Sequence, residues 1–313
     1  MFDKIVKGYK LSQQEVIDLC ENLSLEELSK LANDLREHFL GNKVDTCSIF
    51  NAKSGRCSEN CKWCAQSIFH KTTCDVYPLV SVEKCVEFAK KSKDRGIGRF
   101  SLVTSGKRLS KNDLEKLVEA FREMSKIDDL YLCGSFGLLS KSDFEVLKEA
   151  GMKRFHCNLE SAPSYFSELC TTHSTQDKID SIEAAKSVGM EICSGGIIGM
   201  GETMAHRVEL AITLRDLGVD SIPLNILQPI KNTPLEGNAP LLVEEILRTF
   251  AIFRIINPSV HIRFAGGRMG IKDVQAQALK GGISGVLMGD MLTTVGSDIA
   301  TDFALLDSLN YEY

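Results

Sequence analysis

Three cysteines stand close together early in the chain, in the stretch Cys57-Ser-Glu-Asn-Cys61-Lys-Trp63-Cys64. Thiolates at these spacings suit three irons of a [4Fe–4S] cubane and leave its fourth iron without a protein ligand. A metal site that acts on a small molecule needs such an open position. Zinc is the alternative, but it normally takes a fourth ligand from a second Cys/His pair at short spacing, and none follows the motif. The motif therefore predicts an iron–sulfur cluster with one open iron.

The chain has eleven cysteines in 313 residues, an odd number that cannot all pair. Its first residues, MFDKIVKGYKLSQQEV, lack the apolar centre of a secretion signal, so we expect a cytoplasmic protein with reduced thiols. Isolated cysteines such as Cys20, Cys85 and Cys170 are interpreted as small core residues, because free cysteine is among the most buried residue types.

The composition indicates which partners to expect. Hydrophobic residues make up 43% of the chain and charged residues 25%, and the formal net charge is −5. An acidic balance argues against nucleic acid or an anionic membrane as the partner. No apolar run reaches the ~18 residues of a membrane-spanning helix. We therefore expect a soluble protein with neither nucleic acid nor membrane as a partner.

Apolar residues at helical spacing predict two helices over residues 11–40, after which strands and helices alternate. Eight short runs rich in apolar or β-branched residues predict strands at 46–52, 99–104, 130–136, 153–159, 190–194, 219–226, 260–265 and 285–289. Helical patterns lie between them, near 81–95, 110–124, 140–150, 174–188, 204–217, 241–256 and 272–280.

Eight βα units are what a closed (β/α)8 TIM-type barrel requires, and an open doubly wound sheet is the alternative. Because no linker divides the chain, we predict one barrel over 45–313 with a helical N-terminal extension over 1–44. Glycines that follow the helical patterns suit left-handed C-terminal caps, as at Gly96, Gly151 and Gly218.

Five polar residues occur in the middle or at the C-terminal ends of these apolar strands. Buried asparagine and arginine are costly unless they are paired, so five such positions on five strands predict a lined cavity rather than a solid core. Barrel active sites open at the C-terminal ends of the strands. The five residues are Cys133, Asn158, Cys193, Asn225 and Arg263.

The CxxxCxxC arrangement after the first predicted strand resembles that of the radical S-adenosylmethionine superfamily, and within it the chain is similar to the biotin synthase family. The similarity covers about residues 45–300 and is carried by six stretches. They are KSGRCSENCKWCAQS (53–67), NLES (158–161), ICSGGIIGMGET (192–203), IPLNILQPIKNTPL (222–235), IRFAGGR (262–268) and GDMLTT (289–294).

The resemblance implies that the three motif cysteines hold the cluster and that the free iron binds S-adenosylmethionine. Reductive cleavage of this cofactor would then give a 5′-deoxyadenosyl radical. Glu160 matches a carboxylate that binds the ribose, which suits an acceptor of two hydroxyl groups. Lys178 stands where the family commonly has an arginine for the methionine carboxylate, and lysine lacks the bidentate fork. Ile197 would pack on the adenine, and the aromatic ring of Trp63 stands where it could pack on the same base.

The resemblance further implies sulfur insertion into dethiobiotin to give biotin, with a reductant such as flavodoxin or ferredoxin and a homodimeric assembly. Asn158 and Asn225 match residues that hold the ureido group, and Thr293 and Thr294 match a pair that receives the carboxylate tail. The alternatives are a radical enzyme of the same branch with another small-molecule substrate, and a non-catalytic iron–sulfur or zinc-binding protein.

Many members of the family also hold an auxiliary iron–sulfur cluster inside the barrel, bound by three cysteines and one arginine. Three of these ligands match Cys133, Cys193 and Arg263, but the remaining cysteine position is occupied by Ser101, and serine is a poor substitute for a soft thiolate. We predict that Cys74 replaces it. Cys157 and no replacement at all are the alternatives, and the alternation of HCNLE points Cys157 away from a cavity that Asn158 faces.

Overall fold

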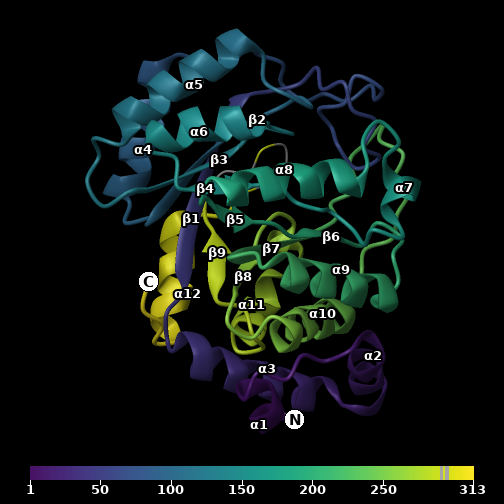
Figure 1. Ribbon diagram of the computed structural model, residues 1–313. Coiled ribbons are helices and arrows are strands. Elements are labelled where there is room, and N and C mark those ends of the chain that lie inside the picture. The colour runs from purple at the N-terminus through teal and green to yellow at the C-terminus, as the bar shows by residue number, and fades with distance from the viewer. Residues whose placement is uncertain (290–291, 293–295) are drawn as a thin grey trace.

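A parallel sheet of nine strands closes on itself in the computed structural model, which describes residues 1–289, 292 and 296–313 (Figure 1). The strands run in the order β5-β4-β3-β2-β1-β9-β8-β7-β6, and β5 also pairs with β7. Their bounds are β1 (Asp45–Lys53), β2 (Arg99–Thr104), β3 (Tyr131–Ser135), β4 (Arg154–His156), β5 (Glu191–Cys193), β6 (Gly196–Ile198), β7 (Ser221–Ile226), β8 (His261–Phe264) and β9 (Gly285–Leu287).

The strands β5 and β6 share one position in the barrel, because both pair with β7 and only Ser194 and Gly195 separate them. The sheet therefore has eight strand positions, and the predicted (β/α)8 barrel is confirmed. The break within the fifth position was not predicted.

Helices surround this barrel. They are α4 (Val82–Asp94), α5 (Lys111–Met124), α6 (Lys141–Glu149), α7 (Phe166–Leu169), α8 (Thr175–Ser187), α9 (Met204–Leu217), α10 (Val243–Ile256), the 3-10 helix η1 (Arg268–Val274), α11 (Gln275–Leu279) and α12 (Ile299–Ser308). Where a single helix was predicted near 272–280, the chain forms η1 followed by α11.

The helix ends follow local chemistry. Seven helices of the described chain begin at a serine or threonine whose hydroxyl accepts a hydrogen bond from a backbone N–H three residues on; these residues are Ser12, Ser24, Ser81, Ser110, Ser140, Ser174 and Thr203. Gly218 ends α9 in the left-handed conformation, with φ of 62° and ψ of 51°, as predicted.

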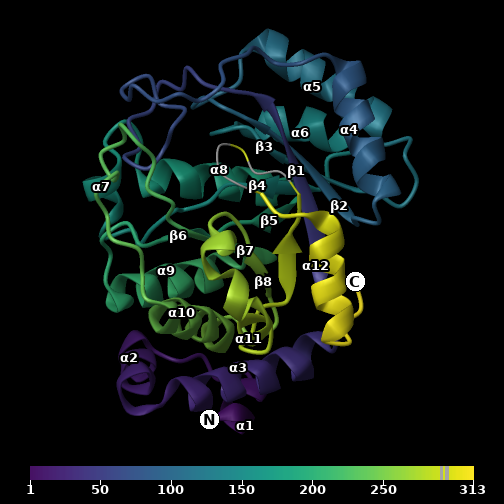
Figure 2. The ribbon, with the colours of Figure 1, turned by 180° about the vertical axis from the view of Figure 1, so that it is seen from behind.

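Three helices precede the barrel: α1 (Phe2–Val6), α2 (Gln13–Asn22) and α3 (Leu25–Leu40). They lie at the lower end of the molecule in Figures 1 and 2, where α3 packs along α10 and α2 contacts α9. The two helices predicted over 11–40 are confirmed, whereas α1 has only five residues and was not predicted. The boundary between 1–44 and 45–313 stays a prediction.

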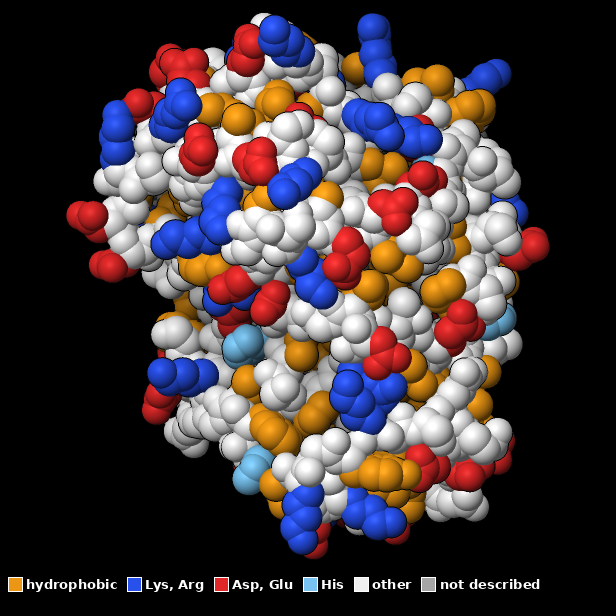
Figure 3. All heavy atoms as spheres, in the orientation of Figure 1, with side chains coloured by type: hydrophobic (Ala, Val, Ile, Leu, Met, Phe, Trp, Pro, Cys, Tyr) orange, Lys and Arg blue, Asp and Glu red, His pale blue; other side chains and the backbone are white. Residues whose placement is uncertain are grey.

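On the face shown in Figure 3, basic and acidic side chains are interspersed over the surface. Among the described residues, no helix combines the length and the apolar character that crossing a membrane would require.

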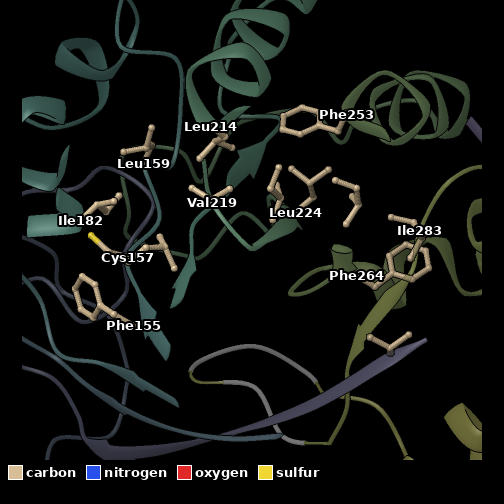
Figure 4. Close-up of a cluster of buried hydrophobic side chains, with 14 of the residues drawn as sticks. Phe155, Cys157, Leu159, Ile182, Leu214, Val219, Leu224, Phe253, Phe264 and Ile283 are labelled. Carbon is tan, nitrogen blue, oxygen red and sulfur yellow. The ribbon is translucent and has the colours of Figure 1, made fainter. Parts of the chain in front are cut away.

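Side chains alternate along each strand, so the barrel has two different cores. Outward-facing residues such as Phe155, Leu224 and Phe264 are fully or almost fully buried and pack under the helices (Figure 4). Inward-facing residues of the strands include buried polar side chains, among them Ser101, Arg154 and Arg263, each at most 4% exposed. The outer layer therefore stabilises the fold and leaves the interior free to carry chemistry.

Arg254 on α10 is fully buried and connects this helix to the segments that lead into β8 and β9. Its guanidinium donates hydrogen bonds to the carbonyl oxygens of Val260 (2.6 Å) and Gly282 (2.8 Å) and to Ser284 Oγ (2.7 Å). One buried side chain thus supplies hydrogen-bond donors to two backbone carbonyls and one hydroxyl group on different chain segments.

We predict that Arg254→Met lowers the free energy of unfolding by about 3–5 kcal/mol, because each buried acceptor left without a donor costs about 1–3 kcal/mol. Urea titration followed by circular dichroism measures the change. Arg122→Met, on the exposed side of α5, is the control and is expected to change the free energy by at most about 0.5 kcal/mol. Equal stability of the two variants would contradict the role given to Arg254.

Candidate active site

The three motif cysteines lie in the loop between β1 and α4, which folds back on itself beside α7 at the upper end of Figures 1 and 2. The Cys57 N–H donates to the carbonyl oxygen of Gln66 (2.9 Å), and the Ile68 N–H donates to that of Cys57 (2.9 Å). Cys57, Cys61 and Cys64 are half-buried and all border one cavity. One loop thus offers three soft donors to the mouth of this cavity, which fits a cubane cluster with one open iron.

A fourth sulfur lies beside this loop. Cys170 Sγ is 3.6 Å from Cys61 Sγ, and His173 Nδ1 is 2.7 Å from the buried Glu59 carboxylate. Cys61, Cys170 and His173 bring their ligand atoms within 4.8 Å of one another. The hydrogen bond from Cys61 lowers the pKa of Cys170 to about 3. Sequence reasoning interpreted Cys170 as a packing residue, although its spacing of three from His173 was a signal of a possible ligand pair.

The cavity has a volume of about 420 Å³ and extends from this loop into the barrel. All five polar strand residues named from the sequence line it: Cys133, Asn158, Cys193, Asn225 and Arg263. The prediction of a lined cavity at the C-terminal ends of the strands is therefore confirmed.

Glu160 borders the cavity in an unusual backbone conformation, with φ of +72°. Its N–H donates to the Gly195 carbonyl (3.1 Å) and its own carbonyl accepts from the Ile197 N–H (2.9 Å), so it pairs with the segment where β5 gives way to β6. A left-handed glutamate costs about 1–3 kcal/mol and persists where the surroundings force it, which often marks a functional site. Its side chain accepts a hydrogen bond from Asn158 (3.3 Å).

The two asparagines are held by backbone groups and keep part of their hydrogen-bonding capacity. Asn158 Oδ1 accepts from the Gly195 N–H (3.0 Å), and Asn225 Oδ1 accepts from the Gly266 N–H (2.8 Å). Each amide nitrogen uses one of its two hydrogens: Asn158 donates to the Glu160 carboxylate, and Asn225 donates to the Gly196 carbonyl (3.2 Å). A primary amide has two donors and two lone pairs. One donor and one acceptor therefore remain on each residue for a ligand.

The residues expected around the adenine and the methionine carboxylate also lie together. Trp63 and Ile197 belong to one apolar cluster with Leu169, Met200 and Leu235. Lys178, 8% exposed, donates from Nζ to the Asn158 carbonyl (2.8 Å) and lines the cavity. Thr293 and Thr294 lie outside the described residues.

At the inner end of the cavity, guanidinium groups surround one carboxylate. Asp45 accepts from Arg99 Nε (2.7 Å) and from Arg263 NH2 (2.6 Å). Burial by itself would raise the pKa of Asp45, but Arg263 and Arg99 hold it well below its usual range. Arg154 pairs with Glu191, 2.9 Å from its Nε. Neither Arg99 nor Arg154 was singled out from the sequence.

The charges at the inner end of the cavity change the pKa of the Cys193 thiol. Burial opposes ionisation of Cys193, but the charge of His156, its hydrogen bond and the nearby arginines lower the pKa of Cys193 to about 7. An interior rich in cations and thiols suits an anionic iron–sulfur group better than a neutral ligand.

The alternatives for the missing cysteine ligand lie in different places. Ser101 lines the cavity and stands opposite Cys133 in the β2–β3 register. Cys74 lies near the mouth of the cavity, where its thiol donates to the Ala65 carbonyl (3.1 Å) and adds to the rise in the pKa of Cys64. It is not among the residues that line the cavity. Cys157 borders the cavity as well, but its sulfur points toward Ile182 in the outer core, as the alternation predicts (Figure 4). The role of Cys74 as a ligand of the interior cluster stays a prediction. Its place near the mouth of the cavity does not favour that role.

Two family models match the chain: the radical SAM superfamily over residues 52–214 and the biotin and thiamin synthesis associated domain over residues 223–312. The fold and the cysteine loop thus place the chain in the radical SAM superfamily. Curated biotin synthases from Parabacteroides distasonis and Brachyspira hyodysenteriae are each 46% identical to it, over 308 and 310 residues. These alignments cover 98% and 99% of this chain and 94% and 93% of the relatives. The chain belongs to the biotin synthase family.

Solved structures give the same fold at lower identity. A methylornithine synthase matches with a TM-score of 0.85 at 20% identity, covering 99% of this chain and 96% of that one. The FeFe-hydrogenase maturase from Carboxydothermus hydrogenoformans matches with a TM-score of 0.82 at 18% identity, covering 99% and 77%. At these identities the likeness concerns the fold alone.

The break between β5 and β6 depends on Gly195. A Cβ atom there would lie 1.9 Å from the Pro223 carbonyl oxygen, a contact that no side chain can make. Gly195 also donates the N–H that orients Asn158. The close approach of this segment to β7 thus sets the position of the polar groups along one wall.

We predict that Gly195→Ala forces the segment away from β7 and lowers the free energy of unfolding by about 1–3 kcal/mol, as overpacking does. Gly98→Ala is the matched control, because a Cβ there meets nothing closer than Thr46 Oγ1 at 3.9 Å. Urea titration of both variants is the measurement. If Gly195→Ala were as stable as Gly98→Ala, the close approach would not constrain the wall.

Proposed function

We propose that this chain inserts sulfur into dethiobiotin to form biotin, using S-adenosylmethionine and a [4Fe–4S] cluster held by Cys57, Cys61 and Cys64. The observation that carries the proposal is that one and the same cavity is bordered by these three thiols at its mouth and by Cys133, Cys193 and Arg263 at its inner end. The names and near-complete coverage of the relatives support the same substrate. When bound, the cluster supplies the electron that cleaves S-adenosylmethionine to methionine and a 5′-deoxyadenosyl radical.

The walls near the mouth suit S-adenosylmethionine. The Glu160 carboxylate can accept from two ribose hydroxyls, and Asn158 beside it limits its rotation. Trp63 and Ile197 provide apolar surface for the adenine. The Lys178 ammonium offers a charge for the methionine carboxylate without the bidentate geometry of an arginine.

Dethiobiotin would lie deeper, against Asn158 and Asn225. A ureido group presents one carbonyl and two N–H groups, which complement the remaining donor and acceptor of each amide. Because the backbone N–H groups of Gly195 and Gly266 fix the amide orientations, the recognition is organised before the substrate binds. We assign the carboxylate tail to Thr293 and Thr294 from the family pattern.

Cys133, Cys193 and Arg263 are proposed ligands of an auxiliary iron–sulfur cluster of uncertain type. Their fit to such a group rests on two features of this cavity wall: both thiols are buried, and Arg99 NH1 and Arg154 NH1 are buried without a hydrogen-bond partner in the described structure. A buried N–H group without an acceptor is costly, and an anionic neighbour would accept its hydrogen bond.

Further parts of the proposal rest on family membership. They are a reductant such as flavodoxin or ferredoxin, a homodimeric assembly and a cytoplasmic location. A radical enzyme of the same branch with a different small-molecule substrate is the alternative, and mass spectrometry for biotin after anaerobic incubation with dithionite, S-adenosylmethionine, dethiobiotin and sulfide separates the two.

We predict that replacing Cys57, Cys61 or Cys64 with alanine abolishes the formation of 5′-deoxyadenosine, because each substitution removes an iron ligand. Anaerobic reconstitution followed by chromatographic assay of 5′-deoxyadenosine is the measurement. Formation at wild-type rates in any of these variants would refute the assignment of the cluster.

Cys170→Ala is the matched control, because it removes a neighbouring sulfur that the motif does not contain. We expect its iron content and its cofactor cleavage to match the wild type. The zinc-binding alternative makes the opposite prediction: the purified protein would hold zinc, and Cys170→Ala would lose it, because Cys61, Cys170 and His173 form a possible ligand set.

We predict that Asn225→Ala weakens dethiobiotin binding about fivefold to 150-fold, since an unpaired buried partner costs about 1–3 kcal/mol. Cleavage of S-adenosylmethionine without substrate should persist. Isothermal titration measures affinity, and Asn238→Ala controls for loss of an amide-to-backbone bond, which Asn238 makes to the Gly199 carbonyl (3.2 Å) away from the cavity lining. Unchanged affinity in Asn225→Ala would reject the role of this residue.

A further inference from the structure

A cysteine that the family resemblance does not assign lies on the cavity wall. Cys47, on β1, is 9% exposed and lines the same cavity as Cys133, Cys193 and Arg263. We propose that Cys47 is the third thiolate ligand of the interior iron–sulfur cluster, in place of the cysteine that Ser101 replaces. This inference rests on the proposed function only in taking the interior group to be an iron–sulfur cluster.

The strand geometry directs Cys47 toward Arg263. Asp45 and Cys47 are two residues apart on β1, so both point into the barrel. Arg263 donates to the Asp45 carbonyl oxygen (2.9 Å) and to its carboxylate (2.6 Å), which brings the guanidinium alongside this part of β1. Cys47 itself is opposite Arg99 on β2 and Leu287 on β9, and both also line the cavity.

Cys47, Cys133 and Cys193 are three buried thiols that line the same cavity. Burial raises the pKa of Cys47 to about 11; Arg263 opposes this rise, and Cys193 adds to it. Burial also raises the pKa of Cys133, and the next largest contribution comes from Cys47. The three thiols and Arg263 line the same cavity, so one group bound there can contact all of them.

The surrounding charges favour an anionic occupant. Three arginines, Arg99, Arg154 and Arg263, face two carboxylates, Asp45 and Glu191, so positive charge is in excess. The NH1 groups of Arg99 and Arg154 are a second sign, because both are buried and make no hydrogen bond among the described residues, although Asp45 Oδ2 lies 3.9 Å from Arg154 NH1. A cluster with thiolate ligands would supply the missing negative charge.

The other three candidates fit less well. Cys157 borders the cavity, but its sulfur points into the outer core (Figure 4). Ser101 lies in the cavity, but its hydroxyl is a hard donor, whereas iron–sulfur clusters select soft thiolates. Cys74 has the right chemistry but lies beside Ala65 and Cys64, near the mouth. Cys47 combines the soft donor with a place in the interior.

The test uses the full-length chain with Cys57, Cys61 and Cys64 all changed to alanine, so that any cluster assembled is the interior one. After anaerobic reconstitution, iron and sulfide are determined chemically and the cluster is followed by Mössbauer spectroscopy. Adding Cys47→Ala should abolish the interior iron and sulfide, whereas adding Cys74→Ala should leave both unchanged. Cys157→Ala, another buried cysteine, is the matched control and should also leave them unchanged.

A rescue variant separates ligation from packing. Adding Ser101→Cys to the Cys47→Ala protein supplies a thiol on the neighbouring strand, opposite Cys133, and should restore interior iron. Loss of iron without rescue, accompanied by a lower melting temperature, would mean that Cys47 only packs. Iron lost with Cys74→Ala and kept with Cys47→Ala would overturn the proposal in favour of Cys74. No interior iron in the parent variant would overturn the interior site altogether.

The proposed function has a separate readout. If the otherwise wild-type chain forms no biotin from dethiobiotin yet its interior iron depends on Cys47, the ligand assignment stands and the proposed substrate fails. If biotin forms and the interior iron content is unchanged by Cys47→Ala, the proposed substrate stands and the ligand assignment fails.

Discussion

The carboxylate of Asp45 holds together the charged interior on which the site depends. A barrel interior filled with branched aliphatic residues would be stable without it, but this one contains Arg99, Arg154 and Arg263. Desolvated guanidinium groups are costly unless they are paired. Asp45 accepts from two of them and Glu191 from the third, so the three strands that carry the arginines are fixed relative to β1 and β5.

This pairing leaves an excess of positive charge at the inner end of the cavity. The same field that lowers the pKa of Cys193 would stabilise thiolates and sulfide, because both are anionic. The mouth is different: its three cysteines lie on a loop, half-buried, with an apolar cluster beside them. One cavity therefore offers a thiol set at each end, with amide and carboxylate groups between them.

The break between β5 and β6 supplies the polar groups in the middle. A continuous strand would pair all of its N–H groups with its neighbours, whereas here the Gly195 N–H binds the Asn158 side chain and Glu160 pairs with the segment in a left-handed conformation. Regular strand pairing is therefore interrupted at the fifth barrel position, and the side chains of Asn158 and Glu160 are oriented by the interrupted segment. Gly195 makes this possible because only hydrogen fits against Pro223.

Much of the architecture and the mouth of the site could be predicted from the sequence. Alternation and helical spacing are local signals, so the strands and most helices are confirmed. The short helices α1 and α7 were missed because four or five residues carry too little periodicity, and the ten-residue α12 was missed as well. The spacing of Cys57, Cys61 and Cys64 indicates a cluster, since residues within one short loop stay together in any fold. The inner end was different. Cys47, Arg99 and Arg154 drew no attention, because their neighbours lie far away in the chain, and only closure of the barrel decides which strand faces meet and which cysteines share a cavity.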